Sequence, residues 1–72
     1  MLRLTTRNSV YEVKAVEGGF SVTKVEAIRD SGFNAVGQTR FSREAYIHEG
    51  QSAIFDDWHT STVLKIEDVP DK

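Results

Sequence analysis

Apolar and polar residues alternate along most of the chain, with the period of two that is typical of a half-buried β-strand. The clearest case is "LRLTT", in which Leu2 and Leu4 alternate with Arg3 and Thr5. Together with a high content of β-branched residues, this pattern predicts five strands, at residues 2–6, 10–16, 20–28, 53–58 and 60–69. Residues 20–28 also allow a helix, although a strand aligns their apolar side chains better.

The segments between these runs contain residues that favour turns. The pair Gly18–Gly19 predicts a hairpin, and "RNS" at 7–9 and "EGQS" at 49–52 predict two further turns. Residues 29–38 carry two glycines, Asp, Ser and Asn, which is typical of a loop. Because a loop of this length in a small domain normally packs onto something, we expect it to fold back through Phe33 and Val36.

Residues 39–48 allow two interpretations. Ser42 is a favoured helix N-cap, and Glu44 and Ala45 follow it, so a short helical turn is predicted near residues 42–47. The alternative is a strand at Tyr46–His48. The sequence leaves both open.

The predicted elements indicate one mainly β domain over residues 1–69, followed by a frayed tail at residues 70–72. Five to six short strands separated by turns favour a small SH3-like barrel. An OB-like barrel, or a twisted antiparallel sheet with one short helix, is the alternative.

Length and composition exclude several classes of protein. The chain has 72 residues and no cysteine, which excludes disulfides and every Cys-based zinc or iron–sulfur site. No run approaches the ~20 apolar residues of a membrane span, and the N-terminus lacks the apolar core of a signal peptide. We therefore expect a soluble cytoplasmic protein that neither spans nor binds a membrane.

Charge is unevenly distributed along the sequence. Residues 1–43 carry seven Lys and Arg against four acids, a net charge of +3, whereas residues 44–72 carry two Lys against seven acids, a net charge of −5. In a small barrel the two halves interleave, and the asymmetry would then be reduced in space.

The stretch "FDDWHTSTVLKI" at 55–66 holds the densest chemistry. Asp57 and His59 could bind a divalent ion, with His48 as a third ligand if its strand is a neighbour, but a closed structural zinc site needs four ligands. A catalytic triad of Ser61, His59 and Asp57 fails, because residues two apart on a strand point the same way and do not converge. We interpret the stretch as a turn entering a buried strand, in which the carboxylates of Asp56 and Asp57 cap backbone N–H groups.

Other chemistry has weak support. Acid–base catalysis by paired carboxylates needs a cleft, for which a domain of this size has little room. No phosphate-binding loop is present, because Gly18–Gly19 lacks the G-x-G-x-x-G spacing. The sequence therefore predicts a protein without enzyme activity, cofactor or metal.

Two kinds of partner remain. The run "TRFSREAY" could form a nucleic-acid surface from Arg40, Phe41, Arg43 and Tyr46, as in small barrels that stack bases on aromatic rings. The net charge of −2 disfavours this alternative, since dedicated binders are usually basic. A protein partner is favoured, or a second copy of the chain in a homodimer, since an unpaired strand edge can add a strand.

The candidate residues for protein contact are Trp58, His59 and Asp57. Tryptophan is enriched at the centres of protein–protein interfaces. Trp58 is either part of the core or an exposed anchor, and in so small a domain one side of the ring could serve each role.

Two short motifs stand near the ends of the chain. The first is TT-x-x-S-x-Y-E and the second is T-S-x-V-x-x-I, formed here by Thr5, Thr6, Ser9, Tyr11, Glu12, Thr60, Ser61, Val63 and Ile66. With these motifs the chain resembles a family of small uncharacterised phage and prophage proteins, notably of actinobacteria. The family usually has Pro where this chain has Thr62, and residues 29–44 have no counterpart. The resemblance implies a phage origin and assigns no site residues.

Overall fold

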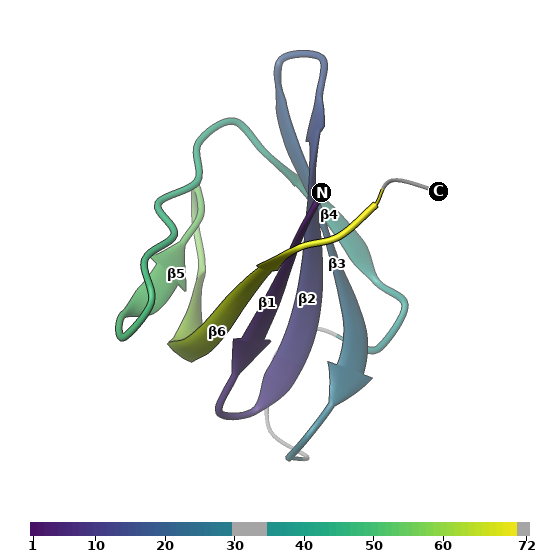
Figure 1. The fold of residues 1–72 in the computed structure, drawn as a ribbon. Helices are drawn as coiled ribbons and strands as arrows, with labels where there is room; N and C mark the ends of the chain where they lie inside the picture. The colour runs from purple at the N-terminus through teal and green to yellow at the C-terminus, as the bar shows by residue number, and fades with distance from the viewer. Residues whose placement is uncertain (30–34, 71–72) are drawn as a thin grey trace.

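Six β-strands make up the regular secondary structure of the chain in a computed structural model that describes residues 1–29 and 35–70. They are β1 (Leu2–Thr6), β2 (Ser9–Val16), β3 (Gly19–Ala27), β4 (Thr39–Ser42), β5 (Ser52–Ile54) and β6 (His59–Asp68). All pairings are antiparallel, and the strand order β4-β3-β2-β1-β6-β5 curls into a half-barrel (Figure 1). The described residues contain no helix, so the prediction of a mainly β fold is confirmed.

Four of the predicted strands lie within one residue of their predicted bounds. The hairpin between β2 and β3 is also confirmed, and Gly18 takes the left-handed φ of 80° that this turn requires. β2 and β3 extend beyond the rest of the sheet at this hairpin (Figure 1).

The fifth predicted strand, at residues 53–58, is wrong in its extent. β5 ends at Ile54, and the chain then turns, because the Phe55 N–H donates to the carbonyl of Trp58 at 2.8 Å. The apolar residues Phe55 and Trp58 continue past the end of β5, so the sequence pattern alone could not show where the strand ends.

The segment between β4 and β5 is extended and contains no helical turn. Tyr46 forms one antiparallel bridge with Ile54, in which each N–H donates to the other carbonyl at 2.9 Å. Of the two interpretations of residues 42–47, the structure therefore excludes the helical turn and retains the strand only as this single bridge.

The loop before β4 does not pack as predicted. Val36 is more than half exposed, so the expectation that it folds back onto the core is wrong. The Gly37 N–H donates to the carbonyl of Lys24 at 2.7 Å, and a bond between backbone groups is enough to hold this end of the loop beside β3. Phe33 and the end of the tail at residues 71–72 lie outside the described residues.

The core fills the concave face of the sheet. Its members come from β1, β2, β3, β5, the turn after β5 and β6: Leu4, Tyr11, Val13, Val22, Ala53, Phe55, Trp58 and Val63. Burial of these side chains supplies the main favourable free energy of folding, at about 25 cal/mol for each Å² of apolar surface.

Buried hydroxyl groups hold the first turn against the last strand. The Thr6 Oγ1 accepts hydrogen bonds from the N–H groups of Asn8 (3.3 Å) and Ser9 (3.0 Å), and donates to the Ser9 carbonyl at 2.9 Å. The Asn8 N–H also donates to the Ser61 Oγ at 3.3 Å. Residues of the two sequence motifs thus lie close together, and their hydroxyl groups form hydrogen bonds with the backbone.

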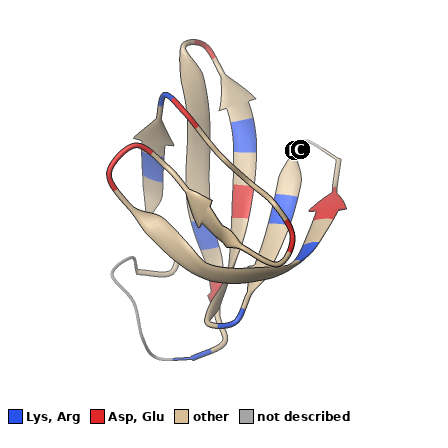
Figure 2. Cartoon of the chain, turned by 90° about the vertical axis from the view of Figure 1, so that its left-hand side faces the viewer, with Lys and Arg blue, Asp and Glu red and all other residues tan. Residues whose placement is uncertain are grey.

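Opposite charges from the two halves of the chain are interleaved. Arg3 on β1 lies opposite Glu12 on β2 and Glu67 on β6, and its guanidinium is 2.9 Å from the Glu12 carboxylate. Figure 2 shows Lys and Arg positions and Asp and Glu positions on neighbouring strands. No helix in the described residues is long and apolar enough to cross a membrane.

Candidate functional site

Trp58 lies at the centre of an aromatic cluster. Its ring centroid is 4.7 Å from that of Phe55 and 5.7 Å from that of Tyr11. The Arg40 guanidinium lies over the Trp58 ring at 5.8 Å from its centroid, within the range of a cation–π contact. Only 7% of Trp58 is exposed, so the residue belongs to the core, and a partner could reach no more than its edge.

Asp56 joins the end of β5 to the end of β4. Its two carboxylate oxygens accept hydrogen bonds from the N–H groups of Arg43 (2.9 Å) and Glu44 (3.0 Å). The Asp56 N–H donates to the Ser42 Oγ at 3.1 Å, and this hydroxyl donates to the Glu44 carbonyl. The bond from the Arg43 N–H is the main reason that the pKa of Asp56 lies below its ordinary value. The prediction that carboxylates cap backbone N–H groups in this turn is confirmed for Asp56, whereas the Asp57 carboxylate accepts no hydrogen bond from the described residues.

The candidate metal constellation does not assemble in the described residues. No group of three or more His, Cys, Asp or Glu side chains lies close enough to hold a metal ion in residues 1–29 and 35–70. The Ser61 Oγ accepts a hydrogen bond from the Asn8 backbone, which is a structural role.

The four residues of the predicted nucleic-acid surface do not share one face. Arg40 pairs with the buried Val22 across β3 and β4, and therefore faces the core, where it covers Trp58. Phe41 is the next residue on β4, so its side chain points to the opposite side and is more than half exposed. Arg43 and Tyr46 are exposed and follow the end of the strand.

An exposed row of side chains crosses the β5 side of the sheet. Tyr46 pairs with Ile54, and Ile54 pairs with His59 on β6, so the three side chains lie on one face. Tyr46 is 56% exposed and Ile54 is 51% exposed. We call these three residues the Tyr46–Ile54–His59 row.

A hollow of about 350 Å³ adjoins this row. Asp57, Trp58 and His59 all line it, together with Ile54 and the neighbouring residues of the turn. The structure thus gathers the three predicted protein-contact residues around one surface feature, with Asp57 and His59 exposed and Trp58 almost fully covered.

Sequence reasoning missed Ile54 and assigned Tyr46 to a different surface. The signal for Tyr46 was the strand interpretation of Tyr46–His48, but nothing in the sequence indicated that Ile54 would be its partner. That pairing depends on the turn that Asp56 stabilises. Comparison of the chain with models of protein families, with curated proteins and with solved structures found no match.

Proposed function

We propose that the chain is a non-enzymatic accessory module that binds a protein through the Tyr46–Ile54–His59 row and the hollow beside it. The observation that carries this proposal is the cross-strand pair of Tyr46 and Ile54, two large side chains that are each more than half exposed. Neighbouring apolar side chains on a surface mark contact sites when they form a patch. Tyrosine is also among the residues that contribute most binding energy at interfaces.

The exposed polar residues at this surface support a protein partner. His59 is the polar member of the row and Asp57 lies at its border, and a polar rim around an apolar centre is the usual anatomy of a protein interface. The Trp58 indole beneath this border packs against the Phe55 ring and the Arg40 guanidinium.

The proposal has finer parts that extend the sequence analysis. They are an SH3-like description of the half-barrel, a phage or mobile-element origin and a cytoplasmic location. The phage origin is supported by the two sequence motifs, whose hydroxyl residues meet at the first turn.

A second copy of the chain is one possible protein partner. β4 is the last strand in the sheet order on its side, and no strand of the described residues pairs with its outer edge. Such an edge can add a strand from another molecule. Phe41 on β4 is more than half exposed and would be covered in this arrangement.

Binding of single-stranded nucleic acid is the alternative function. Two half-exposed aromatic rings, Phe41 and Tyr46, favour it, because bases stack on such rings. The contact of Arg40 with Trp58 counts against it, because that guanidinium faces the core.

The test is affinity capture with matched variants, in lysate of the cells that encode the chain. Ile54→Lys places a charge in the row, and Leu64→Lys is the control because Leu64 is exposed to a similar degree, at 55% against 51%. We expect a protein that the wild type and Leu64→Lys retain and Ile54→Lys loses. Retention of the same proteins by all three chains would contradict the proposal.

Salt separates the two candidate functions. Binding through apolar contacts should change little between ~50 and 200 mM salt, whereas binding to phosphates should weaken by roughly 10³-fold or more if six or more phosphates are contacted. A labelled oligo-dT that bound the chain with such a steep salt dependence would favour the nucleic-acid alternative.

A further inference from the structure

Carboxylates border the Tyr46–Ile54–His59 row on both sides of β5. Residues 44–64 contain no Lys or Arg and four acids, which are Glu44, Glu49, Asp56 and Asp57. All four acids are exposed. Figure 2 looks onto this side of the molecule and shows Asp and Glu on the turns before and after β5. The row therefore lies within a surface of negative charge.

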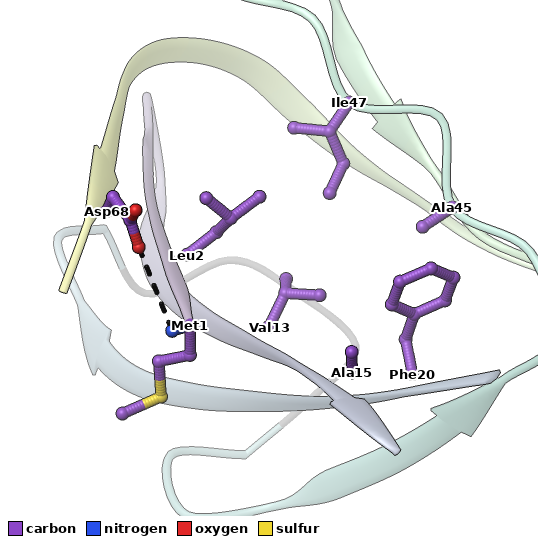
Figure 3. Close-up of a pocket in the computed structure, with 8 residues that line it drawn as sticks. All are labelled: Met1, Leu2, Val13, Ala15, Phe20, Ala45, Ile47 and Asp68. Carbon is purple, nitrogen blue, oxygen red and sulfur yellow. Dashed lines mark ion pairs between the residues drawn. The ribbon is translucent and has the colours of Figure 1, made fainter. Parts of the chain in front are cut away.

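The segment between β4 and β5 directs Glu44 and Tyr46 to the same side. Successive side chains of an extended segment point to opposite sides. Ala45 and Ile47 point into a pocket of about 470 Å³ on the concave face, as Figure 3 shows. Glu44 and Tyr46 therefore point to the outer side, where Tyr46 joins the row.

Arg43 offsets the charge of only one of these carboxylates. The hydrogen bond from its N–H is the main reason that the pKa of Asp56 is lowered, and the charge of its guanidinium makes a smaller contribution in the same direction. Glu44, Glu49 and Asp57 form no ion pair with a Lys or Arg of residues 1–29 and 35–70. Their charge is thus available to a partner.

The apolar part of the surface lies between these charges. Tyr46 and Ile54 are each more than half exposed. The hollow of about 350 Å³ beside them is lined by Ile54, Phe55 and Trp58, and can receive an apolar side chain. A partner that covers this surface must therefore match both an apolar centre and a negative border.

We propose that the protein partner of the row is basic and presents an apolar side chain flanked by Lys or Arg. This inference rests on the proposed function and names the chemistry of the partner. The apolar side chain contacts Tyr46 and Ile54, and the flanking cations lie toward the carboxylates. Like charges that face each other across an interface cost free energy, so an acidic partner is rejected. The phosphates of a nucleic acid would meet the same repulsion.

The experiment titrates the isotopically labelled chain with three synthetic peptides with blocked ends, and follows its backbone amides by NMR. The peptide KKLWLKK has an apolar centre and basic flanks, EELWLEE has the same centre with acidic flanks, and KKGSGKK has the basic flanks alone. We expect KKLWLKK to shift the amides of Tyr46, Ile54 and His59. It should bind at least about fivefold more tightly than either of the other peptides, because each exposed charge pair contributes a factor of roughly 1.5 to 5.

Two charge-reversed chains make the test specific. Glu49→Lys combined with Asp57→Lys replaces two carboxylates beside the row, and should weaken the binding of KKLWLKK by about fivefold or more. Glu17→Lys combined with Glu26→Lys changes the net charge by the same amount at exposed positions in the hairpin after β2 and in β3. This control should bind KKLWLKK within about twofold of the wild type, because distant exposed charges are screened by salt. The amide spectrum of each chain shows directly whether it is folded.

Four results would overturn the inference. They are the absence of shifts in the row at millimolar KKLWLKK, equal or tighter binding of EELWLEE, equal or tighter binding of KKGSGKK, and equal affinity of the wild type and the folded chain with Glu49→Lys and Asp57→Lys. The proposed function is judged separately by protein capture with Ile54→Lys, so equal binding of the basic and acidic peptides at the row would leave it standing. Equal binding of KKGSGKK would count against both, because the apolar residues of the row would then contribute nothing.

Discussion

At the scale of single residues, the side chains that organise this fold are polar. Asp56 binds two successive backbone N–H groups, and Thr6 binds two more in the first turn. These bonds satisfy backbone groups that leave the strands and have no partner within the sheet. The chain changes direction where such a side chain is present.

Replacement of Asp56 by Asn should make stability less dependent on pH. The folded-state pKa of Asp56 is depressed, so the ionised carboxylate stabilises the fold at every pH above the unfolded-state value of about 3.9. That contribution is lost as pH falls through the lower folded-state pKa. Urea unfolding should show Asp56→Asn less stable than the wild type at pH 7, and the two midpoints should converge in acid. Asp57→Asn is the control, and parallel curves for Asp56→Asn and the wild type would contradict the prediction.

Replacement of Thr6 by Val should reduce the free energy of unfolding by about 1–3 kcal/mol, because it leaves the buried Ser9 N–H without an acceptor. Valine has nearly the same shape, so the loss reports the hydroxyl. Thr23→Val removes an exposed hydroxyl that pairs with Thr39 at 2.8 Å and should change stability by less than about 0.5 kcal/mol. Equal losses in the two variants, measured by urea unfolding, would show that burial of the hydroxyl does not matter.

At the scale of elements, the strands differ in how they can be recognised. β1, β2, β3 and β6 are long enough to show the period of two, so the sequence predicts them closely. β5 has three residues, and its end is set by Asp56, which contacts a segment 12 and 13 residues earlier in the chain. No local pattern contains that contact.

Close approach between β3 and β4 depends on Gly19. A Cβ at this position would overlap the backbone oxygen of Ser42 and meet the Phe41 ring at 3.0 Å, so Gly19→Ala should force β4 away from β3. The expected loss is about 1–3 kcal/mol, typical of overpacking. Gly18→Ala meets no atom within 4 Å but carries the strain of a left-handed φ, about 1–2 kcal/mol.

Hydrogen exchange separates these two glycine variants. The amides of β4 should exchange faster in Gly19→Ala alone, because only that substitution disturbs the pairing of β3 with β4. Similar exchange of β4 in both variants would mean that the overlap with Ser42 is relieved elsewhere.

At the scale of the whole molecule, the sequence predicts some residues of the candidate site but not how they are arranged. Asp57, Trp58 and His59 are adjacent in sequence and meet at one hollow. The row beside them requires three separate segments, and the pocket on the concave face is lined from β1, β2, β3, β6 and the segment between β4 and β5. Such sites form only when the whole sheet is assembled, so no short stretch of the sequence predicts them.

Met1 and Val69, near the two ends of the described chain, are hydrogen-bonded neighbours, which permits rearrangement of the chain order. The Val69 N–H donates to the Met1 carbonyl at 2.9 Å. A circular permutant that joins Pro70 to Met1 by a short glycine–serine linker, and opens the exposed hairpin between Glu17 and Gly18, should keep the same sheet. It should be less stable, because β2 and β3 lose their short connection. Circular dichroism and Trp58 fluorescence would check this, and the absence of a cooperative transition would contradict it.

The same pairing governs how the molecule would respond to mechanical tension. Leu2 and Asp68 are the outermost pair between β1 and β6, and antiparallel hydrogen bonds run perpendicular to the strands. A force applied to both ends therefore acts along these hydrogen bonds and breaks them one after another. The domain should yield at low force, and a chain threaded through a narrow pore or an unfolding motor should lose β1 and β6 from the sheet first.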